Sequence, residues 1–209
     1  MTAPPAPRAR RDGEATRQRL LRAALDLFTT HGFRATTTPE IAQRAGVAEG
    51  TIYRHFSGKE HLLNETYRGS QRWALGLLKE IEDSDKALKA PERLTRFGRR
   101  LFEAAERDPA ALRMLFHPRE DRHLDAPSRE TAREFREALQ LVVASGKSDG
   151  LVRPGPAELM AQLWLSIVAF AADRVGAKEW TPDHAHAALS LEAAWDAIAA
   201  KPAVPGQAA

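Results

Sequence analysis

The sequence contains no cysteine, no apolar run long enough to cross a membrane and no stretch that alternates apolar and polar residues as a strand does. The absence of cysteine excludes disulfides and cysteine-ligated metal sites. The longest mostly apolar stretch, residues 159–172, is too short for a membrane span and contains Gln162 and Ser166, so we expect a buried helix there. The first residues lack the apolar block of a secretory signal. We therefore expect a cytoplasmic protein with no membrane partner.

Apolar residues recur in nearly every segment with the period of an amphipathic helix, and glycines and prolines separate these segments. With 43% apolar residues in 209, the chain can bury a sizeable core. We predict an all-α fold, with a disordered basic arm at residues 1–12 and a disordered tail at residues 201–209. The predicted helices cover residues 13–31, 38–45, 49–55, 59–83, 91–107, 109–116, 127–146, 156–176 and 182–200.

Positive charge is concentrated near the N-terminus. Residues 1–72 hold 12 Lys and Arg against 7 Asp and Glu, whereas residues 73–209 hold 19 against 21. A basic segment suits nucleic acid, although arginines on a solvated face give the same count. The charge distribution favours a DNA-binding N-terminal end only weakly.

The most informative segment is residues 36–63, TTTPEIAQRAGVAEGTIYRHFSGKEHLL. Thr37 with Glu40 forms the pattern of a capping box, although Pro39 also suits the first turn of a helix capped by Thr38. Downstream, Ala42 is small enough for a close helix crossing and Gly46 can adopt the left-handed conformation of a tight turn. Together with the apolar residues that follow, this spacing is typical of a helix-turn-helix, but it also occurs in other helical hairpins.

The second helix of this segment, residues 49–55, is too short and polar to be a core helix. Its Thr51, Tyr53, Arg54 and His55 are side chains that suit phosphates and base edges. Ser57 and Glu60 predict a second capping box, which begins a further helix with Lys59 in its first turn. A cation there opposes the helix dipole, so we expect Lys59 to have another partner, such as a phosphate.

Residues 14–63 resemble the TetR family of transcriptional regulators. The resemblance is carried by Ala23, Ala24, Leu27, Phe28, Gly32 and Phe33, then by IAQRAGV, GTIYRHF and KEHLL. It implies a three-helix DNA-binding domain at residues 13–58 and a larger helical domain for ligand binding and dimerisation at residues 59–200. Ala48 departs from the family's usual Ser or Thr, which puts a helix cap and a phosphate contact in doubt.

The resemblance also implies the roles of individual residues in DNA binding. Phosphates would be held by Thr37 or Thr38 and by Tyr53, His55 and Lys59. Gly50 would let the recognition helix approach the bases, which Glu49, Thr51 and Arg54 would read. The predicted double-stranded DNA interface therefore consists of Thr37, Thr38, Glu49, Gly50, Thr51, Tyr53, Arg54, His55 and Lys59.

The larger domain offers apolar residues for an effector cavity, and core packing explains each of them equally well. These candidates are Trp73, Leu77, Phe97, Leu101, Met114, Phe116, Phe135, Leu139 and Trp164. We also predict a homodimer through residues 156–200, with one apolar stripe in each of the last two helices. The stripes are Leu159, Leu163, Ile167 and Phe170, then Ala188, Leu191, Ala194, Trp195 and Ile198.

We find no catalytic triad, phosphate loop or carboxylate pair, and we expect neither an enzyme, a cofactor nor a metal site. His184 and His186, two apart in the predicted last helix, should lie on different sides of it. His117 and His123 flank a polar segment that we expect to be a solvated loop.

These observations predict a transcriptional regulator, chiefly a repressor that a small, largely apolar effector releases from a palindromic operator. The alternative is a DNA-binding structural or interaction protein with a filled core and no effector. In the first case, the helix at residues 59–83, roughly 35 Å long, would act as a lever between the two domains.

Overall fold

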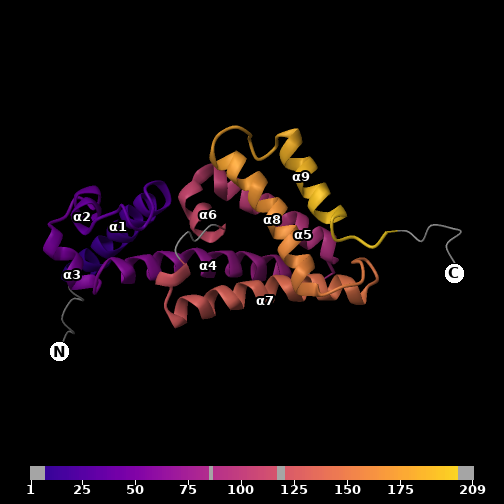
Figure 1. The fold of residues 1–209 in the computed structure, drawn as a ribbon, viewed down its shortest axis with the longest axis horizontal. Coiled ribbons are helices and arrows are strands. Elements are labelled where there is room, and N and C mark those ends of the chain that lie inside the picture. Colours follow the sequence, from indigo (N-terminus) through magenta and orange to yellow (C-terminus); the bar gives the residue numbers. More distant parts are fainter. Residues whose placement is uncertain (1–7, 85–86, 117–120, 202–209) are drawn as a thin grey trace, which may run out of the picture. The chain divides into compact units, whose positions relative to one another are not determined.

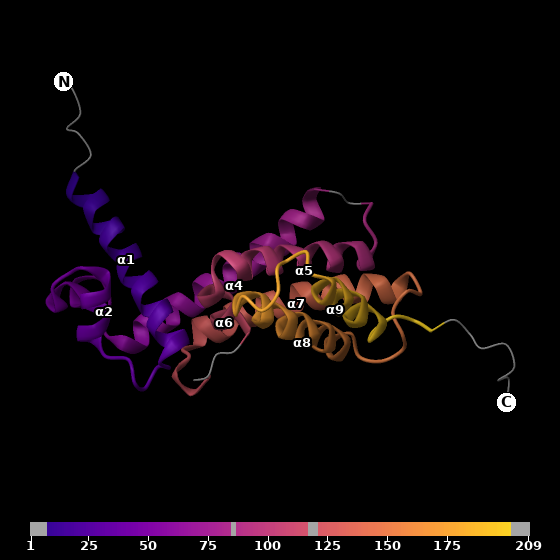
Figure 2. The same ribbon diagram turned by 90° about the horizontal axis from the view of Figure 1, so that it is seen from above.

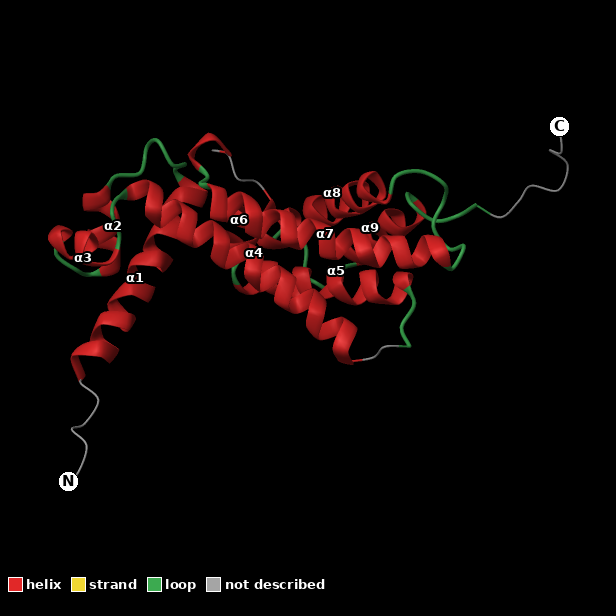
Figure 3. Ribbon diagram, turned by 90° about the horizontal axis from the view of Figure 1, so that it is seen from below, coloured by secondary structure: helices red, strands yellow, loops and turns green. Residues whose placement is uncertain are grey.

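A computed structural model describes residues 8–84, 87–116 and 121–201, whose regular structure is helical (Figure 1), as the sequence predicts. Figure 3 shows these helices joined by loops, with no strand in the described part of the chain. Its elements are, in order, α1 (Arg8–Thr30), α2 (Thr38–Ala45), the 3-10 helix η1 (Glu49–Thr51), α3 (Ile52–His55), α4 (Lys59–Ser84), α5 (Ala90–Arg107), α6 (Pro109–Phe116), the 3-10 helix η2 (Asp121–His123), α7 (Ala126–Ser148), α8 (Ala157–Gly176) and α9 (Ala185–Asp196).

Contacts divide the described chain into two compact units. The first, which we call the head, comprises the described residues up to Ser70 together with Arg113–Glu130. The second, which we call the body, comprises Gln71–Leu112 and the described residues from Thr131 onward. This division falls within helices rather than at the boundary predicted between residues 58 and 59, because the first turns of α4 bury apolar side chains such as Leu62 in the head.

The head has its own apolar core. Leu20 and Phe28 from α1 are buried together with Ile41 from α2 and Ile52 from α3. The α1 and α2 helices are in contact, and the Phe28 and Phe33 rings lie 5.6 Å apart. The short helices α2 and α3, which are too small to be stable alone, thus share one core with the longer α1.

In the body, α8 contacts both α5 and α9, and α5 contacts α9 (Figure 2). The centre is aromatic, since the Phe97 ring of α5 stacks on Trp164 of α8 at 6.2 Å and lies 6.1 Å from Phe135 of α7. Gly98 allows α5 and α9 to approach closely, because a β-carbon there would overlap the Leu191 side chain. The body is therefore held together by close helix packing around large side chains.

The α8 helix covers residues 159–172, where the sequence predicts a buried helix, but only one of its faces is buried. By length and composition alone it could cross a membrane. In the structure it is instead a core helix, because Met160, Trp164, Val168 and Val175 are among its buried residues and it packs against α5 and α9.

Two predicted boundaries at the chain ends shift. The α1 helix begins at Arg8, within the predicted disordered arm, and residues 1–7 lie outside the described residues. At the other end Lys201, the first residue of the predicted tail, is the last described residue, and residues 202–209 lie outside the described residues. Residues 117–120 of the expected solvated loop are likewise outside it, and the loop's remaining residues form η2.

The last helix, α9, is shorter than predicted, because the residues just outside each of its ends form other structure. His184 is the N-cap of α9, and its Nδ1 atom accepts a hydrogen bond from the backbone N–H of His186. The two rings consequently lie 4.7 Å apart, and the prediction that they face different sides of a helix is wrong, since His184 precedes the helix. At the other end, Val152 and Ala199 form an antiparallel bridge that ends the helical run.

Candidate nucleic-acid interface

The α2 helix begins with the capping box that its sequence predicts. Thr37 is the N-cap, its side chain accepting from the Glu40 backbone N–H while its own N–H donates to the Glu40 carboxylate at 2.8 Å. Backbone and side-chain hydrogen bonds from Thr37 lower the pKa of Glu40 below its ordinary value of 4.5. The alternative start, with Thr38 as the cap, is excluded, because Thr38 is already helical.

The turn after α2 has the geometry of a helix-turn-helix. Gly46 adopts the left-handed conformation, with φ of 66°, and its N–H bonds to carbonyls near the end of α2. Ala42 is buried and the Val47 N–H donates to its carbonyl oxygen at 3.0 Å. Ile52 is fully buried on the other side of the turn. The small, flexible and apolar residues therefore occupy the places that the sequence pattern assigns to them.

The predicted recognition helix, residues 49–55, is a 3-10 turn, η1, followed by one α-helical turn, α3. Ala48 precedes it without a side-chain cap, so the missing cap that the sequence suggests is confirmed. A β-carbon at Gly50 would meet nothing within 4 Å, and its backbone conformation does not require glycine. Neither packing nor strain within the chain therefore accounts for glycine at this position.

Most of the predicted DNA-contacting side chains are accessible. Tyr53 is 57% exposed, and Glu49 and Arg54 are exposed beside it. Thr51 and His55 are half-buried. This surface of the head presents one aromatic ring and both signs of charge around an open glycine.

Thr38 connects the start of α2 to the recognition helix. Its hydroxyl lies 3.4 Å from the Tyr53 hydroxyl and donates to the Glu49 carboxylate at 3.4 Å. These long bonds orient Tyr53 and Glu49 on the surface of the head, where both remain available to an outside partner.

Lys59 has the extra partner that its position in α4 requires, but that partner is the protein itself. Its Nζ donates at 2.8 Å to the carbonyl oxygens of Phe33 and Thr36, and it also bonds the Arg34 carbonyl at 3.5 Å. It lies 4.4 Å from the centre of the Phe33 ring as well. Its ammonium group therefore fixes the loop between α1 and α2, while the phosphate contact expected of Lys59 stays a prediction.

The second predicted capping box does not form. The Ser57 backbone N–H donates to Nδ1 of His61 at 3.1 Å, and the Glu60 carboxylate pairs with Nδ1 of His123 at 2.9 Å. Glu60 thus connects α4 to η2 instead of capping its own helix. The sequence could not reveal this because His123 is distant in the chain.

Sequence reasoning also missed a buried polar network in the head. Arg68, only 7% exposed, pairs with Glu65 and donates to Asp125 at 2.9 Å and to Ser128 at 3.0 Å. Glu65 also pairs with Arg17 of α1. The network therefore ties α1, α4 and the beginning of α7 together within the head. The close spacing of Glu65 and Arg68 on one helix was the available signal.

Burial and hydrogen bonding have opposite effects on the pKa values of the two carboxyl groups in this network. Burial by itself would raise the pKa of Glu65, but hydrogen bonds and charge from Arg68 and Arg17 outweigh it and lower that pKa below 4.5. Burial would likewise raise the pKa of Asp125, but hydrogen bonds from Ser128 and Arg68 lower it below 3.8. Both carboxyls are therefore ionised partners of Arg68 at neutral pH.

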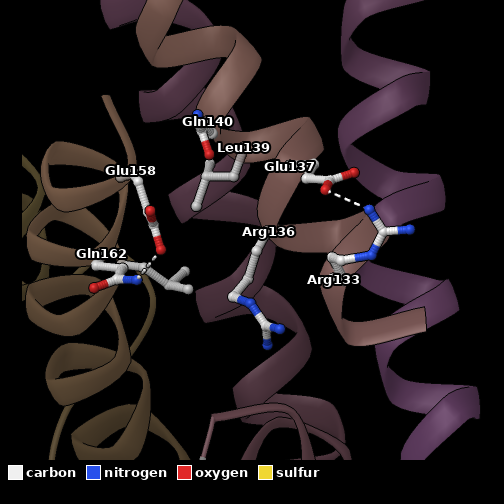
Figure 4. Close-up of a pocket in the computed structure, with 9 residues that line it drawn as sticks. Arg133, Arg136, Glu137, Leu139, Gln140, Glu158 and Gln162 are labelled. Atoms are coloured by element: carbon white, nitrogen blue, oxygen red, sulfur yellow. Dashed lines mark hydrogen bonds and ion pairs between the residues drawn. The ribbon is translucent and has the colours of Figure 1, made fainter. Parts of the chain in front are cut away.

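The predicted effector-binding residues are distributed over both units. Met114 and Phe116 belong to the head and the other seven to the body. Within the body Trp73 is 40% exposed, whereas the remainder are buried. Phe97, Phe135 and Trp164 form the packed aromatic cluster, and Leu139 lines an open pocket between α7 and α8 (Figure 4).

The first of the two predicted dimer stripes is largely exposed on the chain. On α8, Leu159, Leu163 and Phe170 are 47%, 41% and 55% exposed, with Ile167 half-buried between them. Large apolar side chains gathered on one helix face usually mark an interface.

The second stripe, on α9, is only partly accessible, with Ala188 exposed and Trp195 half-buried. Leu191, Ala194 and Ile198 of the predicted α9 stripe are buried within their own chain, with Leu191 packed over Gly98. Leu189, which the prediction omitted, is 59% exposed instead. The predicted stripe is wrong for the three buried residues, because an apolar stripe does not reveal whether it covers its own core or a second chain, and a partner contact through α9 stays a prediction.

No group of three or more metal-ligating side chains comes together among the described residues. The pair of histidines at the start of α9 contacts Trp180 instead, which stacks on His184 at 5.9 Å.

Comparison with known proteins agrees with this geometry. Residues 20–66 match the family of "Bacterial regulatory proteins, tetR family". The chain is 34% identical over 159 residues to the HTH-type transcriptional repressor KstR2 of Rhodococcus jostii, covering 73% of this chain and 75% of that protein.

Solved structures share the fold. A TetR family regulator from Marinobacter aquaeolei superposes with a TM-score of 0.77 at 23% identity, covering 92% of this chain and 100% of the other. The ketosteroid transcriptional regulator KstR2 of Mycobacterium tuberculosis gives a TM-score of 0.68 at 24% identity, covering 88% and 95%.

Proposed function

Because this chain belongs to the TetR family and is a DNA-binding transcriptional repressor rather than an enzyme, we propose that η1 and α3 read its operator from the major groove. The single observation that carries this proposal is Gly50, whose small size nothing in the chain itself explains. A β-carbon would protrude where the backbone of the recognition helix has to approach the bases. The side chains of Glu49 and Arg54 are exposed on the same recognition helix as Gly50. They supply an acceptor and a donor for base edges.

Tyr53, Thr37 and Thr38 supply hydroxyl groups for phosphates at the edge of the same surface. Lys59 is left out of this set, since its ammonium group is engaged by three carbonyls. His55, half-buried in the last turn of α3, is retained as a phosphate contact.

The test is selection of bound sequences from random DNA by the wild type and by two arginine variants. Arg54→Ala should relax the preference at one or two base positions, costing roughly 1–3 kcal/mol of discrimination. Arg99→Ala removes an exposed arginine of the body and serves as the matched control. Selection of the same sequence with equal strength by Arg54→Ala would refute the assignment.

The functional unit in this proposal is a two-fold dimer, and its operator is a near-palindrome. The exposed stripe of Leu159, Leu163 and Phe170 on α8 supports it. Leu189 extends the apolar surface on α9 in place of the buried residues first predicted there. An oligomer of this kind would act in the cytoplasm, where the DNA is.

Release by a small effector that binds the body completes the proposed function. The relative named a ketosteroid regulator supports a ligand with a substantial apolar part. In this scheme α4, which contributes residues to both units, is the lever, and the Arg68 network at its head end holds it to α1 and α7. A coupling of about 1–3 kcal/mol would change operator affinity roughly 5–150-fold, and DNA would weaken effector binding equally.

The second candidate is a regulator with a filled core and no effector. The close packing of Phe97, Phe135 and Trp164 favours it, because these rings occupy the space that the sequence offered as a cavity. Screening small molecules for release of the selected operator separates the two candidates. Equal effector affinity for free and operator-bound protein would also refute the lever.

A further inference from the structure

An open pocket of about 300 Å³ lies in the body between α7 and α8. This size is at the lower end of the range for small-molecule sites, roughly 300–1,000 Å³. Figure 4 shows the Arg136 side chain extending between the two helices, with an Arg133–Glu137 pair on one side and a Glu158–Gln162 pair on the other.

The charges around the pocket leave one cation without a partner. Arg133 donates to Glu137 at 2.8 Å, and Gln162 donates to Glu158 at 3.3 Å. Arg136, by contrast, is exposed to solvent and makes no hydrogen bond or ion pair with the described residues. A free guanidinium presents a planar fork of donors that fits a carboxylate better than any neutral group.

The same surroundings limit the ligand's charge. Both Glu137 and Glu158 line the pocket, so a phosphate or a dicarboxylate would place a second negative charge next to them. A monocarboxylate places only one negative charge there, which the Arg136 guanidinium offsets, so the repulsion is smaller. The Gln140 amide lies at the same pocket and can donate one further hydrogen bond.

The rest of the lining is hydrocarbon. Leu139 and Ala161 are buried side chains at the pocket, and Leu165 is half-buried. An apolar surface next to a single free cation suits an amphipathic molecule, with its charged end at Arg136 and its chain against these residues.

We propose that this pocket binds a small monocarboxylate with a short hydrocarbon chain and that such a compound is the effector. The inference rests on the proposed function for its regulatory meaning, since it names the chemical class of the molecule that releases the operator.

The experiment titrates sodium octanoate into the DNA-free, full-length protein by isothermal calorimetry. Four proteins are compared, namely the wild type, Arg136→Ala, Arg136→Glu and the control Arg99→Ala, an exposed arginine on α5 outside the pocket. We expect the wild type and Arg99→Ala to bind equally. Arg136→Ala should bind roughly tenfold more weakly or worse, and Arg136→Glu should lose binding. The uncharged 1-octanol should bind the wild type at least tenfold more weakly than octanoate.

Equal octanoate affinity in the wild type and Arg136→Ala would overturn the site, as would no heat of binding to the wild type at millimolar octanoate. Circular dichroism shows whether each variant is folded, and the charge-reversed variant provides a second test of the same side chain. Octanoate that binds at Arg136 but leaves operator affinity unchanged would overturn the effector role. Failure of the ligand-free protein to bind its selected DNA would instead refute the proposed function.

Discussion

Lys59 shows how a charge that is unfavourable for one element can stabilise another. Its ammonium group opposes the dipole of α4 but donates to carbonyls of Phe33, Arg34 and Thr36 in the loop before α2. Lys59→Ala would leave these acceptors without their donor. We expect it to lower the free energy of unfolding by about 1–3 kcal/mol in urea titrations, with little change in the salt dependence of DNA binding by the folded protein.

The control is Lys79→Ala, which removes an exposed lysine from the same helix. It should change stability by less than about 0.5 kcal/mol. If Lys59→Ala kept wild-type stability but reduced the slope of binding against salt by about one phosphate contact, Lys59 would be a DNA ligand after all.

The Arg68 network predicts a pH dependence of stability. The folded-state pKa values of Glu65 and Asp125 lie below their ordinary values of 4.5 and 3.8. Because these groups bind protons more weakly when folded than when unfolded, their contribution is present above about pH 5 and is lost as the pH falls through the folded values. We expect the free energy of unfolding to fall steeply below about pH 4.5, as measured by urea titration at a series of pH values.

Asp125→Asn should reduce that acid-dependent fall, since it removes one of the two carboxylates bound by Arg68. Asp149→Asn is the matched control, because Asp149 pairs with the exposed Lys89 at the surface of the body. An identical acid-dependent fall in Asp125→Asn and the wild type would show that the network does not cause it.

For single residues, the sequence predicted the structural role correctly where that role depends on neighbours close by in the chain. The Thr37 capping box and the left-handed Gly46 follow from spacing within a few residues. The contacts of Lys59 and Glu60 were not predicted because their partners, the Phe33 carbonyl and His123, are 26 and 63 residues away in the chain. A side chain's charge can be read from the sequence, but the group that neutralises it depends on tertiary contacts.

The close contact between α5 and α9 in the body depends on Gly98. A methyl group at Gly98 would overlap Leu191 of α9, so Gly98→Ala forces these helices apart or displaces the leucine. We expect a loss of about 1–3 kcal/mol, partly offset by the better helix propensity of alanine. Gly76→Ala in α4 is the control, because nothing lies within 4 Å of its β-carbon position and it should instead gain up to about 1 kcal/mol.

The double variant decides whether the overlap is the cause. In a Leu191→Ala background, the added methyl group at Gly98 has room, so Gly98→Ala should there be neutral or stabilising. Thermal unfolding of the four proteins in this cycle gives the interaction energy. Additive effects would mean that Leu191 is not what Gly98 accommodates.

Element positions were largely predictable because apolar periodicity reports which face of a helix is covered. Helices α2 and α6 have the predicted bounds, whereas α9 was drawn too long at both ends. Periodicity cannot identify what covers a face. It therefore indicated α8 and α9 equally as interface helices, although Leu191 and Ala194 of α9 are buried in their own chain.

At the scale of the whole molecule, the sequence identifies the head more fully than the body. The head's motif is local, and its residues 20–66 match the TetR family directly. The body is determined by contacts among helices far apart in the sequence, such as Phe97 against Trp164. For this reason the predicted cavity residues include a packed cluster, and the pocket at Arg136 was not foreseen.

The oligomeric state connects the two units to function, because a near-palindromic operator requires two heads. Leu163 and Phe170 lie 41% and 55% exposed on α8 and contribute little to the chain's own core. Leu163→Arg with Phe170→Arg would place two charges in the proposed interface, where each loses its hydration without a partner. We expect a folded protein whose dimer dissociation constant rises at least about 100-fold, making it monomeric at micromolar concentration in analytical ultracentrifugation.

Leu141→Arg provides the matched control for these variants, since Leu141 on α7 is 68% exposed and lies outside the proposed interface. It should leave both the sedimentation coefficient and operator affinity at wild-type values. The double variant should lose tight binding to the full operator while keeping weak, salt-sensitive binding to a half-site, because each head still carries its own recognition helix. A double variant that sediments as a dimer and binds the full operator normally would move the interface away from α8.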